Sequence, residues 1–196
     1  MQMLTQSVLQ GTLTNVLDYA MPAFAQVEYR LVGTGAALLH GVALPARDVD
    51  LLVKERAGVD LFASALSSHF TCLTPPTHLV EARQYYAAYE VNGFEVGAST
   101  VEVETESDGI ETFGPGPWQH FVLIPCGKYC IPTVALELRL TTELHRNRPD
   151  RYIPLIRHMQ THGCDLALVR RGMEAGGLPQ ALQKDILSQL KEVSAR

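Results

Sequence analysis

The pattern of apolar and polar positions predicts that the first third of the chain alternates helices with strands. Apolar side chains recur at helical spacing through the first 20 residues and again from Asp60 to His69. Glycine readily adopts the left-handed backbone that ends a helix, so Gly41 marks a helix end. The expected elements are a helix in the first 20 residues, a strand at 27–32, a short helix at 33–40, a strand at 48–53 and a helix at 60–69.

The rest of the chain predicts a hairpin, two short strands and a series of helices. Asn92-Gly93 lies between two alternating segments, a strong signal for a two-residue turn between strands at 85–91 and 94–104. Two prolines within 74–77 predict a break, and the glycine- and proline-rich segment 107–118 predicts a loop. The remaining expected elements are strands at 121–124 and 129–131, then helices at 133–145, 149–162, 165–175 and 178–190.

This order of elements predicts an α/β (α+β) fold, in which a mixed β-sheet is flanked by helices and followed by C-terminal helices. A chain of 196 residues is long enough to bury a substantial core. We expect one main domain over residues 1–160 and a helical extension over residues 161–196.

The composition of the chain bears on which partners it binds and in which compartment it is expected. The formal charge of −5 argues against extended nucleic-acid binding. No stretch approaches the roughly 20 apolar residues of a membrane span, so no membrane partner is expected. The N-terminus lacks the basic and apolar regions of a signal peptide, and four scattered cysteines do not form a disulfide framework. A cytoplasmic protein is therefore expected.

Two carboxylates in the strand at 48–53 are the main candidate for chemistry. Residues two apart on a strand point to the same face, so Asp48 and Asp50 share one face while Val49 and Leu51 pack on the other. Two carboxylates held close together repel each other, and a hard divalent cation such as Mg²⁺ or Mn²⁺ relieves that repulsion. The pattern predicts a metal site suited to phosphate chemistry.

Gly33-Thr34 at the start of a helix, Gly41 at its end and Asp48-Val49-Asp50 on the next strand together resemble the DNA polymerase β-type nucleotidyltransferase superfamily. The similarity is greatest to small bacterial nucleotidyltransferase-like proteins, including the minimal nucleotidyltransferases. The hairpin around Asn92-Gly93 and the segment that ends in Arg148-Pro149-Asp150 extend the likeness, which covers roughly residues 25–160.

The resemblance implies a nucleotidyltransferase-like sheet and a role for each part of the motif. Gly33 and Thr34 would bind the phosphates of a nucleoside triphosphate, with the backbone N–H groups and the helix dipole as the physical basis. Arg47 is the nearby cation and is assigned to nucleotide binding. Asp48 and Asp50 would be the catalytic, metal-binding pair, holding Mg²⁺ or Mn²⁺.

The sequence departs from the family pattern at the third metal-binding carboxylate. The position expected to carry it is Gly97. Glu95 lies two residues earlier on the same face of a regular strand, and Glu102 lies further along the chain. A β-bulge would be needed to re-aim one of these side chains into the site. Both glutamates are kept as candidates for the third carboxylate.

Two functions follow from these residues. The first is Mg²⁺-dependent transfer of a nucleoside monophosphate from an NTP, such as ATP, to a hydroxyl on an acceptor that the sequence does not name. The alternative is a nucleotide-binding module that has lost turnover and acts as a sensor or as a partner in a complex. A separate metal site at His158 and His162, four residues apart on an expected helix, lacks a visible third ligand.

Overall fold

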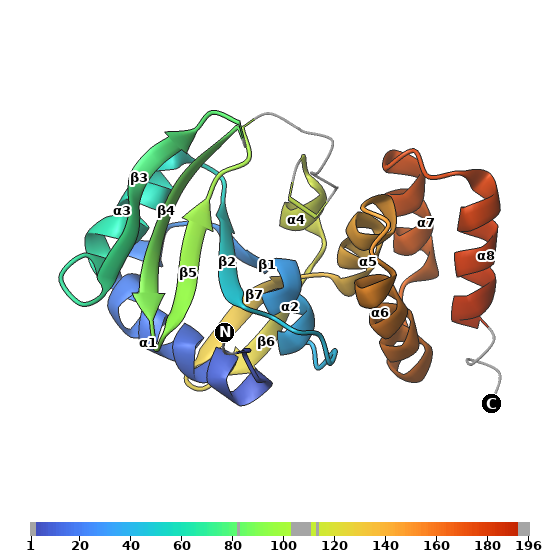
Figure 1. Ribbon diagram of the computed structural model, residues 1–196, viewed down its shortest axis with the longest axis horizontal. Helices are drawn as coiled ribbons and strands as arrows, with labels where there is room; N and C mark the ends of the chain where they lie inside the picture. Colours follow the sequence, from blue (N-terminus) through green and yellow to red (C-terminus); the bar gives the residue numbers. More distant parts are fainter. Residues whose placement is uncertain (1–2, 82, 103–110, 113, 192–196) are drawn as a thin grey trace.

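The computed structural model describes residues 3–81, 83–102, 111–112 and 114–191. Seven strands form one mixed sheet in the order β3-β4-β5-β2-β1-β7-β6 (Figure 1). The strands are β1 (Tyr29–Val32), β2 (Asp48–Val53), β3 (Thr71–Leu79), β4 (Gln84–Val91), β5 (Phe94–Ser99), β6 (Phe121–Cys126) and β7 (Tyr129–Val134). The sheet flanked by helices confirms the predicted fold class.

Eight helices accompany the sheet among the described residues. Helices α1 to α4 are interspersed with the strands, whereas α5 to α8 follow the last strand and lie together at one end of the molecule (Figure 1). The helices are α1 (Gln6–Phe24), α2 (Gly33–Leu39), α3 (Arg56–Leu66), α4 (Gly116–Gln119), α5 (Leu136–His145), α6 (Pro149–His162), α7 (Leu166–Ala175) and α8 (Gln180–Lys191).

The main core lies between the sheet and helices α1 and α3, which also pack on each other. Strand β2 shows how the sequence builds this layer. Val49 and Leu51 are almost completely buried in the core, whereas the alternate residues Asp48 and Asp50 are exposed and partly exposed. Alternation along the strand therefore places the two carboxylates on the face of the sheet opposite the main core.

A second apolar cluster joins the four C-terminal helices to the end of α2. From α2 and the loop after it come Ala37, Val42 and Leu44, and the C-terminal helices contribute most of the rest, among them Leu140 and Leu155. Helix α6 spans the predicted residues, and α7 and α8 flank Gly176-Gly177 as expected. Asp165 caps α7 by accepting hydrogen bonds from two backbone N–H groups of its first turn.

The turn between β4 and β5 fixes the register of the hairpin. Asn92 and Gly93 have φ values of 55° and 80°, the left-handed backbone that a type I′ turn requires. Val91 consequently pairs with Phe94, and the pairing continues in regular steps along both strands. The predicted hairpin is confirmed, but β5 ends at Ser99, and residues 103 and 104 lie outside the described part of the chain.

The predicted break at 74–77 is wrong, because β3 runs through both prolines. β3 lies at one edge of the sheet and has a partner strand on one side only, so it tolerates prolines, which have no N–H to donate. The register with β4 shifts between Cys72 and Thr74 and again between Thr74 and Thr77. These irregularities let the strand continue past Pro75 and Pro76.

Other boundaries also differ from the prediction; α3, for example, runs from Arg56 to Leu66 and not from 60 to 69. β7 extends to Val134, so α5 begins only at Leu136 and not at Thr133. Pairing with β1, through Leu31 and Thr133, keeps this stretch in the sheet. Within the predicted loop 107–118, the described part contains the start of the one-turn helix α4. No helix in the described part of the chain is long and apolar enough to cross a membrane.

Replacing Phe62 by alanine tests the main core. Its side chain is fully buried and lies 6.0 Å from Phe24 and 5.9 Å from Tyr89, measured between ring centroids. We expect Phe62→Ala to lower the free energy of unfolding by about 3–5 kcal/mol in urea titrations, because it leaves a cavity. The neighbouring Leu61 is 41% exposed, so Leu61→Ala should cost only about 0.5 kcal/mol. Equal losses in both variants would contradict this assignment of the core.

Candidate functional site

The two carboxylates of β2 lie beside the turn between β1 and α2. Antiparallel pairing of β1 with β2 sets Val32 opposite Asp50, and Gly33 follows Val32 directly. Gly33 has φ +70°, and a Cβ atom built on it would lie 2.6 Å from Asp50 Oδ2. Glycine is required here both by the left-handed backbone and by the close approach of the carboxylate.

Two cavities open on either side of the aspartate pair. The larger, of about 420 Å³, is lined by Asp48 and is rich in arginine; we call it the arginine cavity. The smaller, of about 200 Å³, is lined by Asp50 and Gly33. Thr34 and Arg47, both predicted for nucleotide binding, lie in the arginine cavity with Asp48. The other residues of the arginine cavity are Met3, Pro45, Arg148, Asp150 and Arg151.

The three arginines of the arginine cavity differ in how they are paired. Arg148 donates to both carboxylate oxygens of Asp150, at 3.0 and 2.8 Å. Arg151 lies 3.3 Å from Glu143. Within the described residues, Arg47 forms no ion pair, so its guanidinium is free to bind an anion next to Asp48. An arginine fork suits phosphate because it can donate two parallel hydrogen bonds.

A buried charge network forms part of the lining of the smaller cavity. Glu111 is completely buried; it accepts a hydrogen bond from the Gly33 N–H at 2.8 Å and another from Arg139 at 2.7 Å. Arg139 also forms an ion pair with Glu143, which is buried as well. Buried charges need partners of this kind, since an unpaired one is strongly destabilising. The Gly33 N–H that the sequence assigned to phosphate is thus bound to Glu111.

The environment of Asp50 favours its neutral form. Burial, and after it the negative charge of Asp48, raise the pKa of Asp50 to about 7, although the positive charge of Arg139 acts in the opposite direction. A divalent cation between the two carboxylates would neutralise the charge that Asp48 and Asp50 share. The donor set of two adjacent carboxylates therefore fits one Mg²⁺ or Mn²⁺ ion.

The residues predicted for a third carboxylate take other positions. Glu95 pairs with Asp48 across β2 and β5, and its carboxylate accepts a hydrogen bond from the Tyr86 hydroxyl at 2.6 Å. Glu102 lies beyond the end of β5, where it forms an ion pair with Arg56 and lies 3.5 Å from His78 Nε2. The structure thus brings Glu95, but not Glu102, to the face that carries the aspartates.

No three histidine, cysteine, aspartate or glutamate residues come together as a metal site anywhere in the described chain. This covers His158 and His162, whose rings stack with centroids 4.0 Å apart. It also covers the four cysteines, which are all unpaired. Among the described residues, the Asp48 and Asp50 pair combines adjacent carboxylates with a cavity that carries positive charge.

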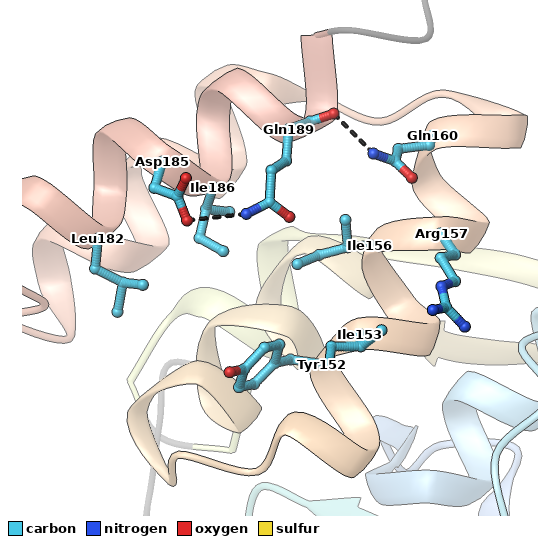
Figure 2. A pocket seen from close by; sticks show the side chains of 9 residues that line it. All are labelled: Tyr152, Ile153, Ile156, Arg157, Gln160, Leu182, Asp185, Ile186 and Gln189. Carbon is cyan, nitrogen blue, oxygen red and sulfur yellow. Dashed lines mark hydrogen bonds between the residues drawn. The ribbon is translucent and has the colours of Figure 1, made fainter.

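Another cavity of about 420 Å³ lies between α6 and α8, far from β2 in the fold (Figures 1 and 2). Figure 2 shows apolar side chains such as Ile156 and Ile186 facing it, with Gln160 donating to the backbone carbonyl of Gln189 at 2.9 Å. Its polar groups bond mainly to one another, and they include no pair of like charges. We therefore take the aspartate pair as the candidate functional site.

Several residues of the site were not identified from the sequence. Tyr86, Glu111 and Arg139 contact it from distant parts of the chain, and nothing in the local sequence of Glu111 and Arg139 marks them. A signal did exist for Tyr86, since the two-residue turn at Asn92-Gly93 fixes which residues of β4 lie beside Gly97.

Comparison with known proteins supports the fold. No family model matches the sequence, and no curated protein matches it. Among solved structures, a crystal structure of a candidate nucleotidyltransferase from Thermotoga maritima aligns with a TM-score of 0.51 and 14% identity. The alignment covers 76% of this chain and 93% of the other. At this identity the likeness shows a shared nucleotidyltransferase-like fold.

The raised pKa of Asp50 predicts how stability depends on pH in the absence of metal. Its folded pKa of about 7 exceeds the unfolded value of about 4, so between these values the folded state holds more protons. Stability contributed by this group is therefore lost as pH rises from 4 to 7. We expect the wild type, in chelator, to lose more than about 1 kcal/mol of unfolding free energy between pH 5 and pH 8.

Asp50→Asn should lack this decrease, whereas Glu90→Gln, which removes an exposed carboxylate from the same sheet, should retain it. Urea titrations at both pH values measure the difference. An Asp50→Asn variant with the same pH dependence as the wild type would show that Asp50 is not the group responsible.

Proposed function

We propose that the protein transfers a nucleoside monophosphate from an NTP to a hydroxyl group of an acceptor, with Mg²⁺ or Mn²⁺ bound by Asp48 and Asp50. The observation that carries this proposal is the position of the pair: Asp50 lies against Gly33 at the start of α2, and Asp48 lies in a cavity with an unpaired arginine. The nucleotidyltransferase-like fold supports the same reaction class.

The arginine cavity suits the phosphates of the NTP. Arg47 and Arg151 supply positive charge, and Thr34 supplies a hydroxyl beside Asp48. The Gly33 N–H would contribute only after Glu111 releases it. The lack of a side chain at Gly33 serves the site in another way, because it leaves room for the Asp50 carboxylate.

The reaction needs little covalent chemistry from the protein. The acceptor oxygen bonds to the α-phosphorus, the bond between the α-phosphorus and the pyrophosphate oxygen breaks so that pyrophosphate leaves, and the proton of the acceptor hydroxyl passes to solvent. When bound, the divalent ion supplies charge neutralisation at the phosphate oxygens. The protein residues hold the phosphates in the arginine cavity and fix their position relative to the acceptor, which accounts for much of the rate enhancement in such reactions.

A second candidate function is a nucleotide-binding module without turnover, acting as a sensor or as a partner in a complex. The observation that favours it is the glycine opposite Asp50, where a third carboxylate would complete the site. Incubation with labelled NTPs and cell extract distinguishes the two functions. Release of pyrophosphate supports the transferase, and nucleotide binding without release supports the module.

Removing both carboxylates tests nucleotide binding itself. We expect Asp48→Asn/Asp50→Asn to bind Mg²⁺-ATP at least about tenfold more weakly in calorimetry, a loss of about 1.4 kcal/mol, because the ion that links protein and phosphates is no longer held. Asp185→Asn, in the cavity between α6 and α8, serves as the control and should bind as the wild type does. Wild-type affinity in the double variant would rule out the proposed site.

The arginine cavity makes a separate prediction. Arg47→Ala should weaken Mg²⁺-ATP binding by about tenfold, since hydrogen bonds to a charged group contribute about 1.5–3 kcal/mol. Arg170, exposed on α7, provides the matched control, because Arg170→Ala removes the same charge at a distance from the site. If both variants lose affinity equally, the effect of Arg47 is one of overall charge and not of a specific contact.

A further inference from the structure

The residue opposite Asp50 on the neighbouring strand decides how many ions the site can hold. β2 and β5 are parallel, and their register pairs Asp48 with Glu95 and Asp50 with Gly97. Neighbouring strands lie about 4.8 Å apart, so a carboxylate at residue 97 would face Asp50 closely enough to share a metal ion with it. Residue 97 is a glycine and offers no such group.

The side chain of Tyr86 fills the space above Gly97. In the β4–β5 hairpin, Ala88 pairs with Gly97 and Tyr86 with Ser99, so Tyr86 lies one step along the same face. A Cβ atom on Gly97 would lie 2.6 Å from Tyr86 Cε2 and 2.8 Å from the Tyr86 hydroxyl oxygen. Contacts this short involve the ring itself, so no side chain fits at residue 97 while Tyr86 keeps its position.

Glu95 holds Tyr86 in this position. The Tyr86 hydroxyl donates a hydrogen bond of 2.6 Å to Glu95 Oε1, which uses the carboxylate nearest to Asp48 on β5. A neutral phenol that donates its proton is no substitute for an anionic oxygen ligand of Mg²⁺ or Mn²⁺. The described residues around the pair accordingly contain no third ligand in place.

We propose that Tyr86, held by Glu95, occupies the place of a third metal-binding carboxylate, so that the site binds one divalent ion and not two. Sites that use two ions hold them about 3.5–4 Å apart with shared ligands, and here the ligands for the second ion are missing. The proposal rests on the proposed function, because it takes Asp48 and Asp50 as the ligands of the first ion. Tyr86 and Asp50 both line the smaller cavity.

Counting bound Mn²⁺ ions tests this inference directly. The signal of free Mn²⁺ in electron paramagnetic resonance gives the number of ions bound per chain, first without nucleotide and then with one equivalent of the ATP analogue that carries a methylene group between the α- and β-phosphates. Two ions at short distance would also produce a spin-coupled signal. We expect the wild type to bind one ion at the protein ligands and to show no coupled signal.

The variant Tyr86→Ala/Gly97→Asp removes the ring and adds the carboxylate. We expect it to bind a second ion and to show the coupled signal. Two controls separate space from charge: Tyr86→Phe keeps the ring, and Tyr86→Ala alone opens the space without a new ligand, so each should bind one ion. Circular dichroism and urea titrations establish that each variant is folded.

Each outcome decides between the alternatives. Two coupled ions in the wild type, or no ion, would overturn the inference, as would a folded double variant that still binds one. If the double variant fails to fold, the number of Mn²⁺ ions bound by the wild type and by Tyr86→Phe still decides whether the site holds one ion or two. Calorimetry with the analogue on the same samples tests the proposed function separately. If the wild type binds one ion but no nucleotide, only the proposed function is contradicted. If it binds nucleotide together with two ions, only the one-ion inference is contradicted.

Discussion

The contact between the Asp50 carboxylate and the backbone of Gly33 is the constraint on which the rest of the site depends. It arises from the register of β1 and β2, which places Val32, the last residue of β1, opposite Asp50 of β2. A Cβ atom at residue 33 would lie 2.6 Å from Asp50 Oδ2, so the position of the Asp50 carboxylate requires glycine at residue 33. The start of α2 and the acidic pair are thereby held as one unit.

This close approach has an electrostatic cost, which the surrounding residues partly offset. Burial and the charge of Asp48 raise the pKa of Asp50, while the buried Arg139 lowers it. Arg139 is in turn balanced by Glu111 and Glu143. Negative charge is therefore disfavoured at Asp50, while Asp48 shares a cavity with Arg47, which forms no ion pair among the described residues. A bound cation would relieve the repulsion between the two carboxylates, and Arg47 suits the phosphates that accompany it.

The parts of the fold that the sequence predicts well depend on local signals. The register of the hairpin follows from Asn92-Gly93, and the shared face of Asp48 and Asp50 follows from strand alternation. The prolines of β3 misled the prediction because an edge strand tolerates them, and only the strand order shows which strand is the edge.

The parts that could not be predicted depend on contacts between distant segments. Glu111 contacts both Gly33 and Arg139, which lie far from it in the sequence, and no local pattern determines these contacts. The pairing of Asp50 with Gly97 likewise follows from the parallel arrangement of β2 and β5. The sequence shows that residue 97, where the resemblance implies a carboxylate, is a glycine. Only the structure shows that the Tyr86 side chain fills the space next to it.

The central claim is that Asp48 and Asp50 hold a divalent cation beside the phosphates of a nucleotide. A crystal soaked with Mn²⁺ and the methylene analogue of ATP tests it most directly through the anomalous scattering of the metal. The account predicts one anomalous peak between the two carboxylates, with the phosphates extending toward Arg47. Nucleotide bound elsewhere, or Mn²⁺ absent from Asp48 and Asp50 while the nucleotide is present, would contradict it.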